Sequence, residues 1–165
     1  MRVSHQARKE LVLNRLVEAR AAVLRAVRAL PPERQFQVFL GEWSAADLVA
    51  HLIGWDHTNA QAARELVAGQ LPGFYAHYDP DWRSYNASLV ARHRKEDMSE
   101  LLADVEASHQ ELLAVLAGIP AAEFVSDKGL RFRGWKVTIE RLLLVEAKDE
   151  LEHARHLEAF GGIVT

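Results

Sequence analysis

Apolar residues recur at helical spacing in four long stretches of the chain. In the first, roughly residues 4–30, leucine and valine return every three or four positions, and charged residues fill the opposite side. Pro31 and Pro32 end this stretch, because proline lacks a backbone N–H and disfavours a helical residue before it. The pattern predicts three further helical stretches, covering residues 44–66, 81–116 with a break after Arg94, and 137–160.

Local signals mark the ends of these helices. Ser44 can cap the second helix, with Asp47 three residues on as in a capping box, and Trp43 can act as a hydrophobic staple. Gly161 and Gly162 close the last helix. No convincing strand appears. The sequence therefore predicts an all-α protein, a four-helix bundle, with residues 1–165 forming a single domain.

The longest loop, residues 69–80, lies between the middle helices and is rich in aromatic residues. Such a loop can form a lid or a pocket wall. Its side chains Phe74, Tyr75 and Tyr78 could line an apolar pocket together with the four tryptophans, and His77 could reach that pocket.

Composition narrows the function classes. Apolar residues make up 49% of the 165 residues and charged residues 26%, which is typical of a globular protein. The chain has no cysteine, so any metal must be bound by His, Asp or Glu. With a net charge of −3, and with Arg20, Arg25 and Arg28 interpreted as a solvated face, we expect no nucleic-acid partner. No signal peptide and no stretch of about 20 apolar residues is evident, so we expect no membrane partner and a cytoplasmic location.

The last helix carries ionisable residues within its apolar face. Glu146, Glu150 and His153 fall inside this face, and Asp149 lies at its edge. Buried ionisable groups are costly unless they are paired, hydrogen-bonded or bound to a metal. Asn59 falls on the buried side of the second helix and likewise needs a partner, in the bundle or on a ligand.

One interpretation of these residues is a metal site. Asp149 and His153 are four residues apart and project from the same side of the helix, and His51 on the second helix is the candidate third ligand. Two imidazoles and one carboxylate suit Zn, Ni, Fe or Mn and leave positions open for water or substrate. The alternative is structural, since a core-facing histidine is commonly hydrogen-bonded, and Glu146 and Glu150 could pair with arginines from other helices.

The remaining histidines are weaker candidates. His57 points away from His51, and His156 lies nearer the solvent side of the last helix than His153. The sequence predicts surface positions for the others, namely His5, His93 and His109.

Two separated segments resemble the DinB/YfiT-like superfamily. Residues 43–52 (WSAADLVAHL) resemble the start of that family's second helix, in which a Trp-Ser pair leads to a metal-binding histidine. Residues 149–157 (DELEHARHL) resemble its HxxxH helix, with Asp149 in place of the first histidine. Residues 81–86 (DWRSYN) through 119–120 resemble the ClbS/DfsB branch.

The resemblance implies a metal-dependent enzyme of the hydrolase or thiol-transferase class. A divalent metal (Zn, Ni, Fe or Mn) on His51, Asp149 and His153 would activate water or a low-molecular-weight thiol for attack on a small electrophilic substrate. Glu150 or Glu146 would act as general base or as hydrogen-bond partner of a ligand. The resemblance also implies an up-down-down-up arrangement of the four helices and a homodimer. The alternative is a metal-free, ClbS-like protein that binds or sequesters a reactive small molecule, and a third reading is a helical interaction module.

Overall fold

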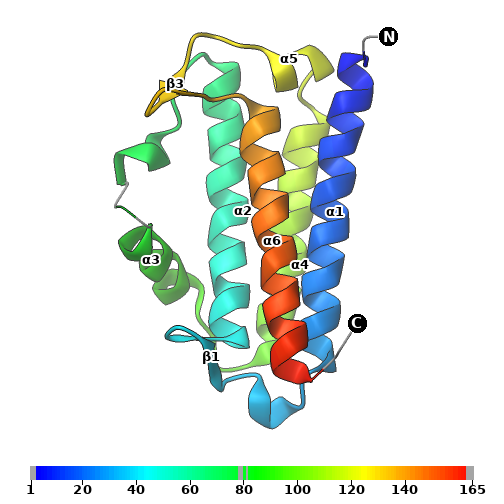
Figure 1. Cartoon of the computed structure of the whole chain (residues 1–165), viewed down its shortest axis with the longest axis vertical. Helices are drawn as coiled ribbons and strands as arrows, with labels where there is room; N and C mark the ends of the chain where they lie inside the picture. The colour runs from blue at the N-terminus through cyan, green and yellow to red at the C-terminus, as the bar shows by residue number, and fades with distance from the viewer. Residues whose placement is uncertain (1–2, 78–79, 81, 163–165) are drawn as a thin grey trace.

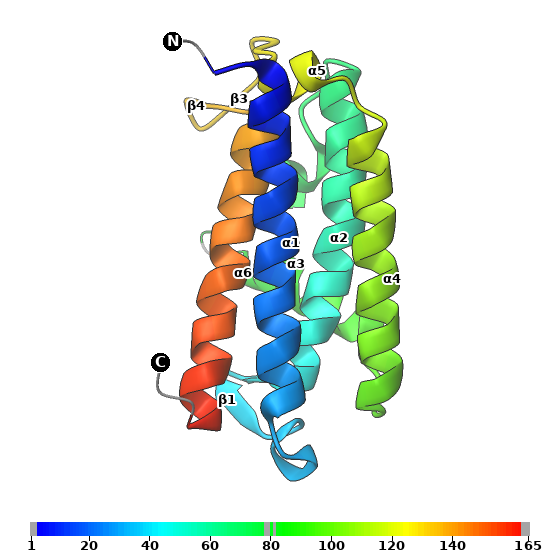
Figure 2. The same cartoon turned by 90° about the vertical axis from the view of Figure 1, so that its right-hand side faces the viewer.

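The computed structural model describes residues 3–77, 80 and 82–162 and shows a bundle of four long helices (Figure 1). α1 runs down the bundle, α2 and α4 run up, and α6 runs down again, which confirms the predicted up-down-down-up topology (Figure 2). The bounds of the four helices are α1 His5–Ala29, α2 Ala45–Val67, α4 Met98–Ala117 and α6 Ile139–Gly161. None of the helices in the described part of the chain is long and apolar enough to cross a membrane.

The helix ends follow the local sequence signals. The Ser44 hydroxyl accepts from the backbone N–H of Asp47, and the Asp47 carboxylate accepts from the Ser44 N–H, which completes the predicted capping box. At the end of α6, Gly162 takes a left-handed backbone conformation with φ 77°. These contacts are local, and this is why the sequence predicts them.

Short elements cover the ends and one side of the bundle. α3 (Arg83–His93) packs on α2, where a methyl group added to Gly54 would lie only 2.6 Å from Leu89 Cβ, so this glycine permits the close approach. Two small antiparallel hairpins, which the sequence did not predict, are β1–β2 and β3–β4. Their strands are too short to show an alternating pattern. The bounds are η1 Pro32–Arg34, β1 Val38–Leu40, β2 Trp43–Ser44, η2 Gly73–His77, α5 Ala121–Val125, β3 Arg131–Phe132 and β4 Trp135–Lys136.

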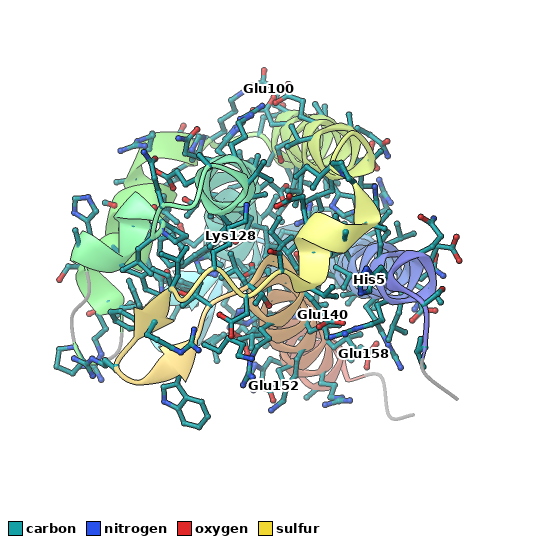
Figure 3. All side chains as sticks on the ribbon, turned by 90° about the horizontal axis from the view of Figure 1, so that it is seen from above. His5, Glu100, Lys128, Glu140, Glu152 and Glu158 are labelled. Carbon is teal, nitrogen blue, oxygen red and sulfur yellow. The ribbon has the colours of Figure 1, made fainter. Side chains whose placement is uncertain are left out.

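Apolar side chains fill the bundle in two clusters, one at each end. Charged residues such as Glu100 and Glu152 point outward, as seen along the bundle axis (Figure 3). Between the two clusters lies a buried polar layer made of Arg20, Asp56, Ser108 and Glu150, which stand near the midpoints of the four long helices.

Candidate functional site

The buried polar layer is held together by one arginine. Arg20 is 2% exposed and donates two hydrogen bonds to Asp56 at 2.8 and 2.9 Å and two to Glu150 at 2.8 and 3.1 Å. The Ser108 hydroxyl donates to Asp56 at 2.6 Å. The sequence interpretation of Arg20 as part of a solvated face is therefore wrong: it lies on the inner face of α1, where its charge is compensated by two carboxylates that are remote in sequence.

The predicted surface position of His109 is also wrong. The sequence predicted a surface position, but the side chain is 6% exposed and its pKa is lowered to about 4 by burial and by the Arg20 charge, against the opposing effect of Asp56. His5 and His57 are exposed, whereas His93 is half-buried with its ring 5.6 Å from that of His57.

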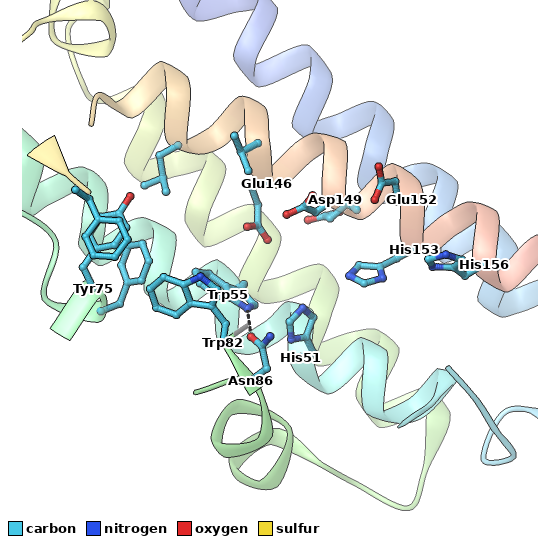
Figure 4. Close-up of a pocket in the computed structure, with 15 residues that line it drawn as sticks. His51, Trp55, Tyr75, Trp82, Asn86, Glu146, Asp149, Glu152, His153 and His156 are labelled. Atoms are coloured by element: carbon cyan, nitrogen blue, oxygen red, sulfur yellow. Dashed lines mark hydrogen bonds between the residues drawn. The ribbon is translucent and has the colours of Figure 1, made fainter. Parts of the chain in front are cut away.

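A pocket of about 470 Å³ opens beside this polar layer, between α2 and α6 (Figure 4). Five aromatic side chains form its wall, contributed by α2, η2, the start of α3 and the β3–β4 hairpin: Trp55, Phe74, Tyr75, Trp82 and Phe132. The prediction that the aromatic loop forms a pocket wall is thus confirmed for Phe74 and Tyr75, while Tyr78 lies outside the described residues. His77 lines a different cavity, and Trp135 is exposed.

Ring contacts and one hydrogen bond hold the aromatic wall in place. The indole N–H of Trp55 donates to Asn86 Oδ1 at 2.9 Å (Figure 4). The Phe74 ring meets the Trp55 ring edge-on, with the ring centroids 5.4 Å apart. Tyr75 stacks on Phe132 at 4.3 Å, which joins the loop after α2 to the β3–β4 hairpin. These contacts assemble a wall from segments far apart in the sequence.

Two imidazoles approach each other across the pocket. His51 from α2 and His153 from α6 have ring centroids 5.7 Å apart, and neither Nδ1 has a hydrogen-bond partner among the described residues (Figure 4). Burial, together with the neighbouring His153, lowers the pKa of His51 to about 3. Burial and His156 lower the pKa of His153 to about 4, although Glu152 opposes this. Both rings are therefore neutral at pH 7.

Glu146 points from α6 into the pocket, and the pKa of its carboxyl group is strongly raised (Figure 4). Burial and the negative charges of Glu150, Asp149 and Asp56 raise its pKa to about 8, against the opposing effect of Arg20. At pH 7 Glu146 is mainly the neutral acid and can donate a hydrogen bond or a proton. Glu150 also borders the pocket, but its carboxylate is already occupied by Arg20.

The predicted metal ligands are only partly brought together. Asp149 is exposed at the rim of the pocket, one turn from His153, and its pKa is raised by partial burial and by Glu152. Over residues 3–77, 80 and 82–162, no three His, Asp or Glu side chains are arranged so that they could hold one ion. The set His51, Asp149 and His153 stays a prediction, with the two histidines as its structurally supported part.

Asn59 lies on the buried side of α2, as predicted, and is 1% exposed. Neither its amide nitrogen nor its oxygen has a partner in the part of the chain that the structure describes. The sequence thus predicted that Asn59 is buried, but it did not identify a hydrogen-bond partner for its amide group.

The DinB superfamily sequence model matches residues 15–157. The chain belongs to the DinB superfamily. Two similar crystal structures are an uncharacterised protein from Escherichia coli UTI89, at 15% identity, and the colibactin self-resistance protein ClbS in complex with a dsDNA, at 17% identity. Both superpose with a TM-score of 0.73 over 95% of this chain, covering 96% and 97% of the respective structures.

These two structural relatives establish the fold of this DinB-superfamily protein. No functionally curated protein matches its sequence.

Proposed function

We propose that this protein binds a small reactive molecule in the pocket between α2 and α6 and thereby protects against it, without requiring a metal. The main support for this function is a preformed cavity of about 470 Å³, which combines an aromatic wall with Glu146, a carboxylic acid that is mainly neutral at pH 7. The similarity in fold to ClbS supports a self-protection role as a proposal.

Glu146 gives the pocket a chemical function beyond binding. Because its acid form predominates at neutral pH, it can transfer a proton to a bound molecule, and the neutral rings of His51 and His153 can accept hydrogen bonds beside it. The rim is open at Asp149, where water can reach a bound molecule.

A fragment screen by NMR tests the proposal. Small aromatic fragments of mixed charge should shift the indole N–H signals of Trp55 and Trp82 but not that of exposed Trp135, which serves as an internal reference. The variant Val145→Trp places a bulky ring at the pocket and should weaken binding at least tenfold, whereas Leu11→Trp, on an exposed site of α1, should not. Absence of any fragment that shifts Trp55 would exclude a ligand pocket here.

The second candidate is the divalent-metal enzyme implied by the family resemblance. The observation in its favour is the pair His51 and His153, both neutral at pH 7, with unpartnered Nδ1 atoms and ring centroids 5.7 Å apart. Metal bound there would polarise water or a low-molecular-weight thiol for attack on an electrophile. Asp149 would be the third ligand.

Zinc and nickel titration of the purified protein separates the two candidates. For a metal enzyme we expect about one ion per chain, and His51→Ala and His153→Ala should each weaken binding by about 100-fold or more, because one of few ligands is lost. His5→Ala, at the exposed start of α1, is the matched control. Binding that is weak, or that is insensitive to both substitutions, would count against the metal site. The homodimer and the lack of a nucleic-acid partner stay predictions.

A further inference from the structure

The ionisable side chains around the pocket are unevenly charged. Carboxyl groups border it at four positions of α6, namely Glu146, Asp149, Glu150 and Glu152, and no lysine or arginine is found among its described lining residues. Arg20 reaches Glu150 from inside the bundle, but it is also bound to Asp56. One guanidinium thus faces two carboxylates, and the polar layer behind the pocket keeps a net negative charge when both are ionised.

The unpaired groups of the pocket are hydrogen-bond acceptors or can become acceptors. His51 is 6% exposed, is directed into the pocket and has no partner for Nδ1, and a neutral imidazole offers one nitrogen lone pair (Figure 4). Burial and the neighbouring carboxylates raise the pKa of Glu146 and keep it protonated near neutral pH, and the charge of Arg20 offsets them only in part. A ligand that brings both N–H donors and a positive charge would satisfy these groups.

The wall opposite α6 also favours a cation. The faces of aromatic rings attract positive charge, most strongly for tryptophan, and Trp55 and Trp82 stand in this wall with Phe74 between them at 5.4 and 5.7 Å. The described residues offer no three-ligand set for a metal ion. The volume of about 470 Å³ instead suits an organic molecule.

We propose that the molecule bound in this pocket carries a positively charged nitrogen with at least one N–H group, as in a protonated amine or amidine. This inference rests on the proposed function, since it names the class of ligand for the same pocket. The positive nitrogen lies between the aromatic wall and Glu146, which binds it as a carboxylate. The proton of Glu146 passes to solvent when the ligand enters as a cation, or to the ligand nitrogen when an amine enters uncharged. The N–H groups donate to Glu146 and to an imidazole.

Four benzyl probes that differ mainly in charge and N–H content test this. The probes are benzylammonium, benzyltrimethylammonium, benzyl alcohol and phenylacetate, each titrated while the Trp55 indole signal is followed by NMR. We expect benzylammonium to bind at least tenfold more tightly than benzyl alcohol, benzyltrimethylammonium to fall between them, and phenylacetate to be the weakest. Affinity for benzylammonium should rise roughly 50-fold from pH 6 to pH 8, because the cation binds the ionised form of Glu146.

The matched variants are Glu146→Gln, which should remove this pH dependence, and Glu158→Gln, outside the pocket on the same helix, which should leave it unchanged. If benzyl alcohol or phenylacetate binds as tightly as benzylammonium, the charge inference is wrong while the ligand pocket stands. If none of the four probes shifts Trp55 and the fragment screen also fails, the proposed function itself is wrong.

Discussion

Replacing Arg20 with methionine should destabilise the protein by about 3–5 kcal/mol, because it leaves Asp56 and Glu150 buried without their only cationic partner among the described residues. This loss is a large part of the total free energy of unfolding, which is about 5–15 kcal/mol for an ordinary domain. Methionine keeps an unbranched apolar stem and favours helix, so the loss of the guanidinium group is the main change. The free energy of unfolding from urea denaturation measures the effect.

Arg28→Met is the matched control for the Arg20 variant. Arg28 lies on α1, like Arg20, and pairs with Glu106 of α4, but both side chains are about half exposed, and the expected loss is below about 1 kcal/mol. The triple variant Arg20→Met, Asp56→Asn, Glu150→Gln removes the charges together and should regain part of the stability lost by Arg20→Met alone. Equal losses for Arg20→Met and Arg28→Met would show that the buried pairing is energetically unimportant.

Glu146→Gln should change how stability depends on pH. The pKa of Glu146 is raised from 4.5 to about 8 in the folded protein. Between these two pH values, the folded state therefore holds a proton that the unfolded state has already released. Its contribution to stability is therefore fully present below pH 4.5 and is lost as the pH rises through 8. The groups that act on it are Glu150 and Asp149 on the same helix, Asp56 on α2 and Arg20 on α1.

The difference in unfolding free energy between the parent and Glu146→Gln isolates this effect, because all other titrations are common to both proteins. From pH 6 to pH 8 the parent should lose about 2 kcal/mol relative to the variant. Glu152→Gln, exposed on the same helix, should show no such relative change. A constant difference between the parent and Glu146→Gln would mean that Glu146 is ionised throughout this range.

The site combines two kinds of positions that differ in how well the sequence reveals them. Glu146, Glu150 and His153 were found because charged residues interrupt the apolar face of a single helix, and that periodicity is a local property. The pocket wall was found only in part. Phe132 was missed, because it comes from a segment without regular periodicity, and its position depends on stacking against Tyr75 from a distant loop.

The sequence by itself determined the four helices and their ends, because capping residues, prolines and helical periodicity act over a few neighbouring positions. The up-down-down-up topology was predicted through the family resemblance, since local signals do not fix how helices are arranged. It also determined which face of α6 carries ionisable groups. Only the tertiary structure decided the charge state of those groups. Arg20 and His109 were assigned to the surface and prove to be buried, since their environment is made by other helices.

The same distinction applies to the chemistry of the pocket. The sequence shows that histidines stand at positions 51 and 153 and a glutamate at position 146. Their neutral state at pH 7, however, results from burial and from charges that packing brings close to them. Proton affinity depends on all groups within a few ångströms, most of which are distant along the chain. The helix pattern therefore predicted the site, and the packing of α1, α2 and α6 determined what the site can bind.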